Sequence, residues 1–196
     1  MKKNDDFTIN SKDIEANESL NKKNGFIKKF FKDWIVPIFA ALVIAVLINK
    51  FIFFNVYVPT GSMIPTINEN DKILVTRIYN PEKIQRGDII VFYSEELQET
   101  LIKRAIGLPG DHIDIKDGVV SVNGEVLKED YVKNNDDFTG SFDVPEGKFF
   151  FLGDNRANSN DARLWINSYI DASEIKGEAR FRFYPVSYTH LTLPTT

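Results

Sequence analysis

The sequence predicts a mostly β fold in which an antiparallel β-sheet body follows one N-terminal transmembrane helix. Two observations lead to this prediction. Between Val56 and Tyr184 the apolar residues form short runs rich in β-branched and aromatic side chains, separated by turn signals such as Pro109-Gly110. No run shows a helical period over a dozen residues, so the body should contain at most short helices. Before the body lies one apolar run, residues 34–54, which is long enough to cross a membrane.

The first segment, residues 1–33, is predicted to be a polar cytoplasmic tail. It carries eight lysines against six acidic residues, and its first 25 residues show no hydrophobic periodicity. A segment of this composition cannot bury enough apolar surface to fold. We therefore expect residues 1–25 to be disordered.

The second segment, residues 34–54, contains only two polar residues, Asn49 and Lys50. As a helix it would span roughly 30 Å, the thickness of the hydrocarbon core, and Lys50 near its end can reach the headgroups. The residues before it carry five lysines, whereas residues 55–72 contain only Lys72. The positive-inside rule then places the N-terminus in the cytoplasm and the body on the extracytoplasmic face. A cleaved secretory signal is the alternative, but the run is too long and no small-residue cleavage site follows it.

The third segment, residues 55–186, is the predicted β-rich body. Its expected strands are Lys72–Ile78, Asp88–Tyr93, Thr100–Ile106, His112–Lys116, Val119–Val122, Lys148–Leu152 and Ala179–Tyr184. Two turns, Asp117-Gly118 and Asn123-Gly124, suit tight hairpins and predict a β-meander over residues 112–127. The region from Asp111 to Phe142 is otherwise polar, and we expect an accessory lobe remote from the chemistry.

Composition excludes several classes of site. The chain has no cysteine, so it has neither disulfides nor a thiolate nucleophile. Its two histidines, His112 and His190, are not spaced as metal ligands, so no metal and no other cofactor is expected. From Phe51 onward there are 15 basic and 22 acidic residues, a balance that disfavours a nucleic-acid partner.

The segment Pro59–Thr66 holds a candidate nucleophile, Ser62, on a bend just after the membrane run. Taken alone, Ser62 also fits a small residue that fills a turn. Thr60 and Gly61 beside it offer a hydroxyl and an unhindered backbone, which an oxyanion site requires. A serine becomes nucleophilic only when a base accepts its proton, so the rest of the chain must supply that base.

Lys103 is the strongest candidate for the base, ahead of His112 and His190. In a strand it shares a face with Leu101 and Ala105, while Arg104 points the opposite way. A lysine on an apolar, buried face loses hydration, which lowers its pKa. To act near neutrality the pKa must fall by about three units from about 10.4. The alternative is an exposed lysine at the edge of a sheet.

A polar loop, residues 153–163, could orient this amine. It follows an apolar strand and concentrates acidic, amide, arginine and serine side chains within eleven residues. Ser159 could hydrogen-bond to Lys103, and Asp161 or Asp154 could pair with Arg163 or Arg104. An ordinary polar surface loop is the alternative.

Taken together, four segments resemble the ordered motifs of bacterial type I signal peptidases, the membrane-anchored Ser-Lys proteases, and in particular the Gram-positive type. They are PTGSMIPT (59–66), GDIIVF (87–92), KRAIGLPGD (103–111) and GDNRANSNDAR (153–163). By matching position, the resemblance makes Ser62 the nucleophile, Lys103 the general base and Thr60 a member of the oxyanion hole. It makes Ser159 the residue that orients Lys103, and Asp161 with Arg163 a supporting ion pair. It makes Asp154 and Arg104 further structural supports of the loop 153–163, here called the catalytic loop.

The resemblance implies a serine endopeptidase that removes signal peptides from exported preproteins, cleaving after small residues at positions −1 and −3. Its partners would be secretory preproteins and membrane lipid, and we expect a monomer in the cell membrane. Two departures stand out. Ala162 replaces a common serine, and the last ten residues, 187–196, match no expected ending and suggest a foreign sequence.

Two other functions compete with this one. A self-cleaving repressor-type Ser-Lys protein would share the chemistry but act in the cytosol, and the membrane run and the lack of DNA-binding helices count against it. A membrane-anchored binding module without activity is the other alternative, although every chemical group for catalysis is present.

Overall fold

The computed structural model describes residues 29–184. The predictions for residues 1–28, for His190 and for the tail 187–196 lie outside the described residues. The chain divides into two compact units, residues 1–49 and 50–196.

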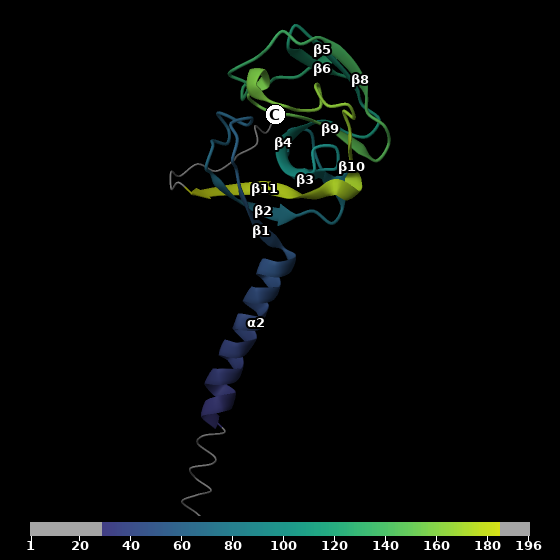
Figure 1. Ribbon diagram of the computed structural model, residues 1–196. Helices are drawn as coiled ribbons and strands as arrows, with labels where there is room; N and C mark the ends of the chain where they lie inside the picture. The colour runs from purple at the N-terminus through teal and green to yellow at the C-terminus, as the bar shows by residue number, and fades with distance from the viewer. Residues whose placement is uncertain (1–28, 185–196) are drawn as a thin grey trace, which may run out of the picture. The chain divides into compact units, whose positions relative to one another are not determined.

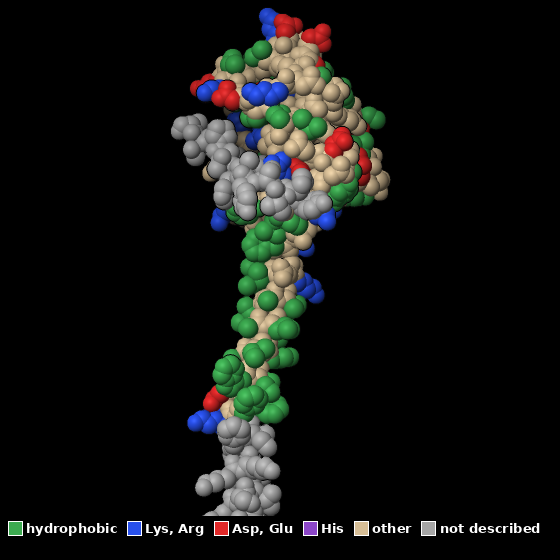
Figure 2. Space-filling model, turned by 90° about the vertical axis from the view of Figure 1, so that its left-hand side faces the viewer, with side chains coloured by type: hydrophobic (Ala, Val, Ile, Leu, Met, Phe, Trp, Pro, Cys, Tyr) green, Lys and Arg blue, Asp and Glu red, His purple; other side chains and the backbone are tan. Residues whose placement is uncertain are grey.

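The first unit is helical where it is described. A π-helical turn, η1 (Phe31–Ile35), continues into α2 (Val36–Phe51). Together they form a 21-residue apolar helix, long enough to cross a membrane and with none of its residues buried. Hydrophobic side chains cover its surface (Figure 2).

The helix runs from Phe31 to Phe51, so each of its ends lies three residues before the corresponding end of the predicted segment 34–54. At its C-terminal end the cause is strand pairing, because Phe53 and Phe54 lie in a strand. Phe54 pairs with Val75 and packs against buried core residues. Aromatic residues suit both a membrane helix and a strand, so the apolar pattern alone did not mark this boundary.

The second unit contains two antiparallel sheets (Figure 1). The strands are β1 (Phe53–Tyr57), β2 (Lys72–Arg77), β3 (Ile89–Ser94), β4 (Glu99–Gly107), β5 (His112–Lys116), β6 (Val119–Val122), β7 (Glu125–Val126), β8 (Gly140–Asp143), β9 (Lys148–Leu152), β10 (Ile170–Asp171) and β11 (Ile175–Tyr184). Three short 3₁₀ turns join them: η2 (Pro81–Lys83), η3 (Arg156–Asn158) and η4 (Ala172–Glu174). This confirms the predicted mostly β fold with no long helix in the described part of the body.

The larger sheet has seven strands in the order β1-β2-β11-β3-β4-β9-β10. Apolar side chains pack on both of its faces, which form two separate buried clusters. The larger cluster includes Phe92, stacked on Phe151 with ring centroids 4.4 Å apart. The smaller cluster includes Met63 and Ile102. The central strands β3 and β4 are therefore buried on both sides, which restrains the side chains that they carry.

The smaller sheet has four strands in the order β7-β6-β5-β8. The predicted meander over residues 112–127 is confirmed, because β5, β6 and β7 pair in sequence. Both residues of each turn, at Asp117-Gly118 and Asn123-Gly124, have positive φ, as tight hairpins of this kind require.

Candidate active site

Ser62 lies in the connection between β1 and β2, where local packing fixes its position. Met63 next to it is completely buried in the smaller apolar cluster. A turn forms around it, since the Ile67 amide donates to the Met63 carbonyl at 2.9 Å. The side chain of Met63 therefore anchors this connection in the body. Ser62 itself is 7% exposed.

Lys103 lies on β4 opposite Ile90 of β3, on the face that also carries Leu101 and Ala105. Its Nζ donates a hydrogen bond to the Ser62 Oγ at 2.6 Å, across 41 residues of sequence. Lys103 is only 3% exposed. The structure thus joins the two side chains that the sequence predicted as nucleophile and base.

Burial lowers the pKa of Lys103 from its usual 10.5 to about 8, because the charged amine loses hydration. The nearby carboxylates of Asp161, Glu99 and Asp154 favour the charged form and limit this fall, whereas Arg163 favours the neutral form. About a tenth of the amine is therefore neutral at pH 7 and half of it at about pH 8, and a neutral amine can accept a proton.

The loop 153–163 follows β9 and contains the predicted ion pairs. Arg104, next to Lys103, forms two hydrogen bonds with Asp154, at 2.8 and 2.5 Å. Thr66 also donates to Asp154, at 2.5 Å. The Asp154 carboxylate is completely buried and the Arg104 side chain is 4% exposed. The sequence left open whether Asp154 pairs with Arg163 or with Arg104, and in the structure it pairs with Arg104.

Asp161 pairs with Arg163 through two hydrogen bonds of 2.8 and 2.9 Å. The same carboxylate accepts from the Gly153 amide at 3.0 Å. The Arg163 amide also donates to this carboxylate, at 3.3 Å. Asp161 is completely buried, so its charge is balanced locally by one guanidinium and two backbone amides. This arrangement closes the loop onto its own beginning.

Two of the predicted site residues, Ser159 and Thr60, form no hydrogen bond with the side chains of Ser62 and Lys103 among the described residues. Ser159 is 5% exposed, and its Oγ has no hydrogen-bond partner among the described residues. It lies close by, since a Cβ atom added at Gly153 would be 2.2 Å from the Ser159 Oγ and 2.6 Å from the Ser62 carbonyl oxygen. Thr60 is exposed two residues before Ser62.

One residue that the sequence analysis did not single out links the loop directly to the nucleophile. The Asn155 amide donates to the Ser62 carbonyl at 3.0 Å, and its side chain donates to the Gly61 carbonyl at 2.9 Å. Asn155 therefore holds the backbone of the serine turn. The signal was present in the composition of the loop, but nothing in the spacing distinguished this asparagine from its neighbours.

The prediction that the accessory lobe is remote from the chemistry is wrong. Residues 128–139, here called the buttressing loop, contact the catalytic loop at several points. Its Glu129 pairs with Arg156 through bonds of 2.6 and 3.1 Å, and its Asp136 pairs with Arg163. The reason for the error is that these contacts join polar segments whose sequence has no periodic pattern.

Two further contacts extend this network. The Asn134 side chain donates to the Asn155 side chain at 2.7 Å, and the Tyr131 ring lies 3.9 Å from the guanidinium carbon of Arg104. The buttressing loop is therefore linked to the turn of Ser62 through Asn155. It is linked to β4, the strand that carries Lys103, through Arg104. Within residues 29–184, no cluster of three or more acidic or histidine side chains could hold a metal ion.

Comparisons with known proteins agree on one family. A sequence profile described as "Signal peptidase, peptidase S26" matches residues 31–184. The chain is 36% identical over 169 residues to a probable signal peptidase I-1 from a Synechocystis species, covering 81% of this chain and 85% of that protein. It is 34% identical over 180 residues to signal peptidase I of Bacillus licheniformis, covering 86% and 94%.

Two more matches are of the same kind. Signal peptidase IB of Staphylococcus aureus is 33% identical over 181 residues, covering 82% of this chain and 93% of that protein. A crystal structure of a signal peptidase I from Enterococcus faecalis aligns with 34% identity and a TM-score of 0.43, covering 49% of this chain and 96% of that one.

Proposed function

Because the chain belongs to the signal peptidase family, peptidase S26, we propose that it removes signal peptides from preproteins with a Ser62–Lys103 catalytic dyad. The observation that carries this proposal is the 2.6 Å hydrogen bond between Lys103 Nζ and Ser62 Oγ in a buried site. Among the described residues, Lys103 is the only basic side chain that forms a hydrogen bond with the Ser62 hydroxyl.

In the proposed mechanism, neutral Lys103 accepts the proton of Ser62 while the Ser62 Oγ attacks the carbonyl carbon of the scissile peptide. The resulting oxyanion accepts hydrogen bonds from the Ser62 backbone amide and the Thr60 hydroxyl. The Lys103 ammonium then gives its proton to the leaving amine, so the peptide C–N bond breaks and an acyl-enzyme remains.

The second half of the reaction uses the same base. Lys103, neutral again, accepts a proton from a water molecule that attacks the acyl carbon. The ester bond to Ser62 breaks, the carboxylic product leaves, and the serine recovers its proton from Lys103. Two buried ion pairs, Asp154 with Arg104 and Asp161 with Arg163, hold β4 and the catalytic loop in place. Ser159, which is also buried, orients the amine of Lys103.

We also propose where the enzyme works and what it selects. The apolar helix anchors it in the cell membrane as a single span, with the N-terminus in the cytoplasm and the body outside. The extended cleavage segment of the preprotein would pair with a sheet edge near Ser62, where shallow pockets admit small side chains at −1 and −3. The enzyme acts as a monomer without a metal or cofactor.

The decisive experiment incubates the full chain in detergent with a preprotein and locates the cut by mass spectrometry. Ser62→Ala and Lys103→Ala should each abolish processing, because each removes one partner of the dyad. The matched controls are Ser141→Ala and Lys116→Ala, both exposed positions on the smaller sheet. Near-normal turnover by either dyad variant would exclude the role assigned to that residue.

Specificity is tested with the same substrate. Replacing the residue at −1 or −3 by phenylalanine should stop cleavage, whereas the same replacement at −2 should be tolerated. Cleavage at an unchanged rate with phenylalanine at −1 would contradict the proposed small pockets.

A further inference from the structure

A pocket separate from the Ser62 site lies among β2, β11 and η2. Its volume is about 330 Å³, and it is lined in part by Thr76, Arg77, Lys83, Glu178 and Arg180. Thr76 and Glu178 are direct partners across the β2–β11 ladder, and Arg180 lies at an irregularity of the same ladder, between Ala179 and Phe181. The floor of the pocket is therefore formed by these two strands.

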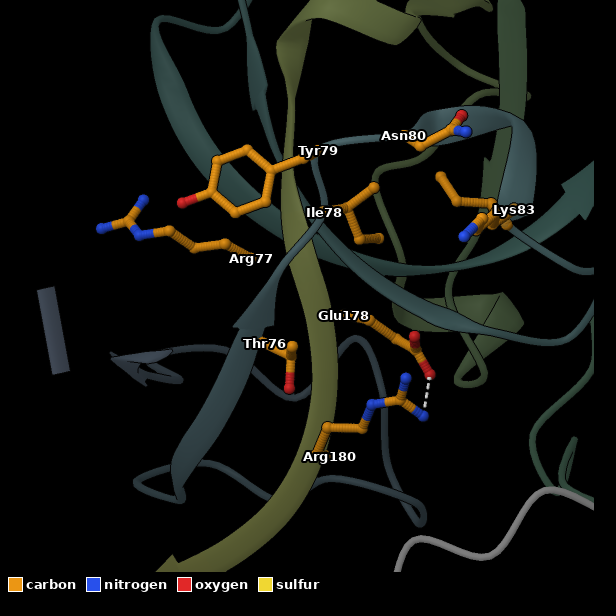
Figure 3. A pocket seen from close by; sticks show the side chains of 9 residues that line it. Thr76, Arg77, Ile78, Tyr79, Asn80, Lys83, Glu178 and Arg180 are labelled. Carbon is orange, nitrogen blue, oxygen red and sulfur yellow. Dashed lines mark ion pairs between the residues drawn. The ribbon is translucent and has the colours of Figure 1, made fainter. Parts of the chain in front are cut away.

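Three cationic side chains line this pocket against one carboxylate. In Figure 3, Arg77 and Tyr79 lie on one side of the β11 ribbon, and Lys83 and the Glu178–Arg180 pair lie on the other. The Glu178–Arg180 distance is 2.8 Å. The amine of Lys83 forms no hydrogen bond or ion pair with another described residue, and this lysine is exposed. The pocket is thus rich in positive charge, although residues 51–196 carry 22 acidic against 15 basic side chains.

The turn between the strands presents Lys83 at a fixed position. The Asn80 side chain accepts from the Glu82 amide at 3.1 Å and caps η2, and Pro81 begins the turn. Ile84, which follows it, is 6% exposed and belongs to the larger apolar cluster. Lys83 therefore extends from an anchored turn and not from a free loop.

The pocket also contacts the end of the apolar helix. Arg77 Nε donates to the Lys50 carbonyl at 3.3 Å, and the Tyr79 hydroxyl donates to the Phe51 carbonyl. Lys50 and Phe51 are the last two residues of α2. Both residues belong to the second unit. Lipid headgroups begin where a membrane helix ends, so headgroups would be near a pocket that contacts these two residues.

We propose that this pocket binds the phosphodiester headgroup of an anionic membrane phospholipid. Guanidinium groups match phosphate oxygens in geometry, and a lysine amine adds a point charge beside them. Basic side chains next to a membrane helix attract anionic lipid. Lipid is favoured over a soluble phosphate compound because the pocket adjoins the residues where the span ends. The proposal rests on the membrane anchorage proposed above and is independent of the Ser62–Lys103 dyad.

The test measures lipid binding to the full chain in a nonionic detergent by native mass spectrometry. The probes are dihexanoyl phosphatidylglycerol, dihexanoyl phosphatidylcholine and inorganic phosphate. The wild-type chain should retain one phosphatidylglycerol at concentrations at which it retains no phosphatidylcholine. Lys83→Glu should weaken phosphatidylglycerol binding at least five-fold, and Arg180→Gln should weaken it as well, because it leaves the Glu178 charge unpaired.

The matched control is Lys116→Glu, the same change of charge at an exposed position on β5, and it should alter binding less than two-fold. Equal binding of phosphatidylcholine, an unchanged affinity in Lys83→Glu, or displacement by equimolar inorganic phosphate would overturn the proposal. Preprotein cleavage is measured on the same samples. A chain that cleaves preproteins but retains no phosphatidylglycerol would refute the headgroup site and leave the proposed function intact.

Discussion

Lys103 shows how a single side chain can be costly to the fold and useful to the chemistry. Its amine is almost completely buried, and burial is the largest influence on its pKa. The carboxylates of Asp161 and Asp154 reduce the cost of the charged form, but each is already paired with an arginine. The amine is thereby kept near the point at which it can both accept and return a proton.

The first prediction concerns the pH dependence of activity. Because the pKa of Lys103 is lowered to about 8, its neutral form should grow with pH and reach half at about pH 8. Below that pH, kcat/KM should fall about ten-fold for each pH unit, since only the neutral amine acts as the base. The measurement is kcat/KM against pH with a peptide substrate that has no titratable group between pH 6 and 10. An acidic limb centred below pH 6.5 or near pH 10 would contradict this assignment.

The second prediction is that Lys103→Met stabilises the protein at pH 7 while it abolishes processing. At pH 7 the wild-type amine is mostly charged in both the folded and the unfolded state, and burial penalises the folded one. Removing the amine should raise the free energy of unfolding by about 1 to 3 kcal/mol. The loss of its hydrogen bond to Ser62 makes this gain smaller.

The sign of its pH dependence follows from the lowered pKa. Between about pH 8 and 10.5 the unfolded wild-type chain binds the proton that the folded chain has released, so wild-type stability rises with pH. The advantage of Lys103→Met should therefore shrink across this window. Denaturant titrations at pH 7 and pH 10 measure this difference in the free energy of unfolding between variant and wild type, with Lys116→Met as the exposed control. A variant less stable than the wild type at pH 7 would show that burial of the amine carries no such cost.

At the scale of elements, the site depends on loops that stabilise one another. The catalytic loop 153–163 holds the serine turn through Asn155. The buttressing loop 128–139 in turn holds the catalytic loop by pairing with two arginines of that loop, Arg156 and Arg163. Arg156 also donates from Nε to the Gly153 carbonyl at 3.0 Å, so its guanidinium links both loops. The position of the nucleophile thus depends on residues from a segment that carries no catalytic group.

The third prediction is that Glu129→Gln lowers both stability and activity. It leaves the Arg156 guanidinium, 2% exposed, without its carboxylate. Breaking a buried pair by removing one partner is strongly destabilising, and because Glu129 itself is 11% exposed we expect about 2 kcal/mol. The value of kcat should fall several-fold as the catalytic loop loses its support.

The neighbouring variant Asp130→Asn is the matched control. Asp130 pairs with Lys128 at 3.1 Å, but both side chains are largely exposed, so its loss should cost less than about 1 kcal/mol. Denaturant titration and preprotein processing are measured for both variants. Equal effects at positions 129 and 130 would show that the buttressing loop does not support the site.

How far the sequence predicted these elements depended on pattern and length. Strands β5, β6 and β9 have the predicted bounds, because turn residues flank compact apolar runs. The two-residue strands β7 and β10 are too short to show a period, and β8 begins at a glycine in a polar segment. They form because a neighbouring strand offers free backbone groups, which is tertiary information.

At the scale of the whole molecule, the sequence predicted that Ser62 and Lys103, the proposed dyad, lie together, but it did not predict the contacts that hold them. Ser62 and Lys103 could be paired from motif order and from the chemistry that a serine requires. The contacts of Glu129 and Asp136 with arginines 27 residues away could not be predicted, because the sequence of a polar loop carries no signal for long-range pairing. The headgroup pocket was equally hidden, since its cations come from three separate segments.

The charge distribution of the chain predicts its direction in the membrane. Four lysines precede the apolar helix within residues 22–29 and a fifth, Lys32, lies in its first turn, whereas residues 51–196 have seven more acidic than basic side chains. Lysines beside a span are retained on the cytoplasmic side. The body, with Ser62, should therefore lie on the extracytoplasmic face, where an exported preprotein presents its cleavage segment.

The fourth prediction tests this topology with the chain's lack of cysteine, which allows single thiols to be introduced without background. Ser11→Cys places one thiol before the helix, and Lys116→Cys places one on β5 of the body. In intact spheroplasts a membrane-impermeant maleimide should label the Lys116→Cys variant within minutes and leave the Ser11→Cys variant unlabelled, because only the extracytoplasmic side is accessible. After detergent is added both variants should react, which controls for expression and reactivity. Labelling of Ser11→Cys but not of Lys116→Cys in intact spheroplasts would reverse the topology and leave the proposed dyad on the side of the membrane where exported preproteins are not cut.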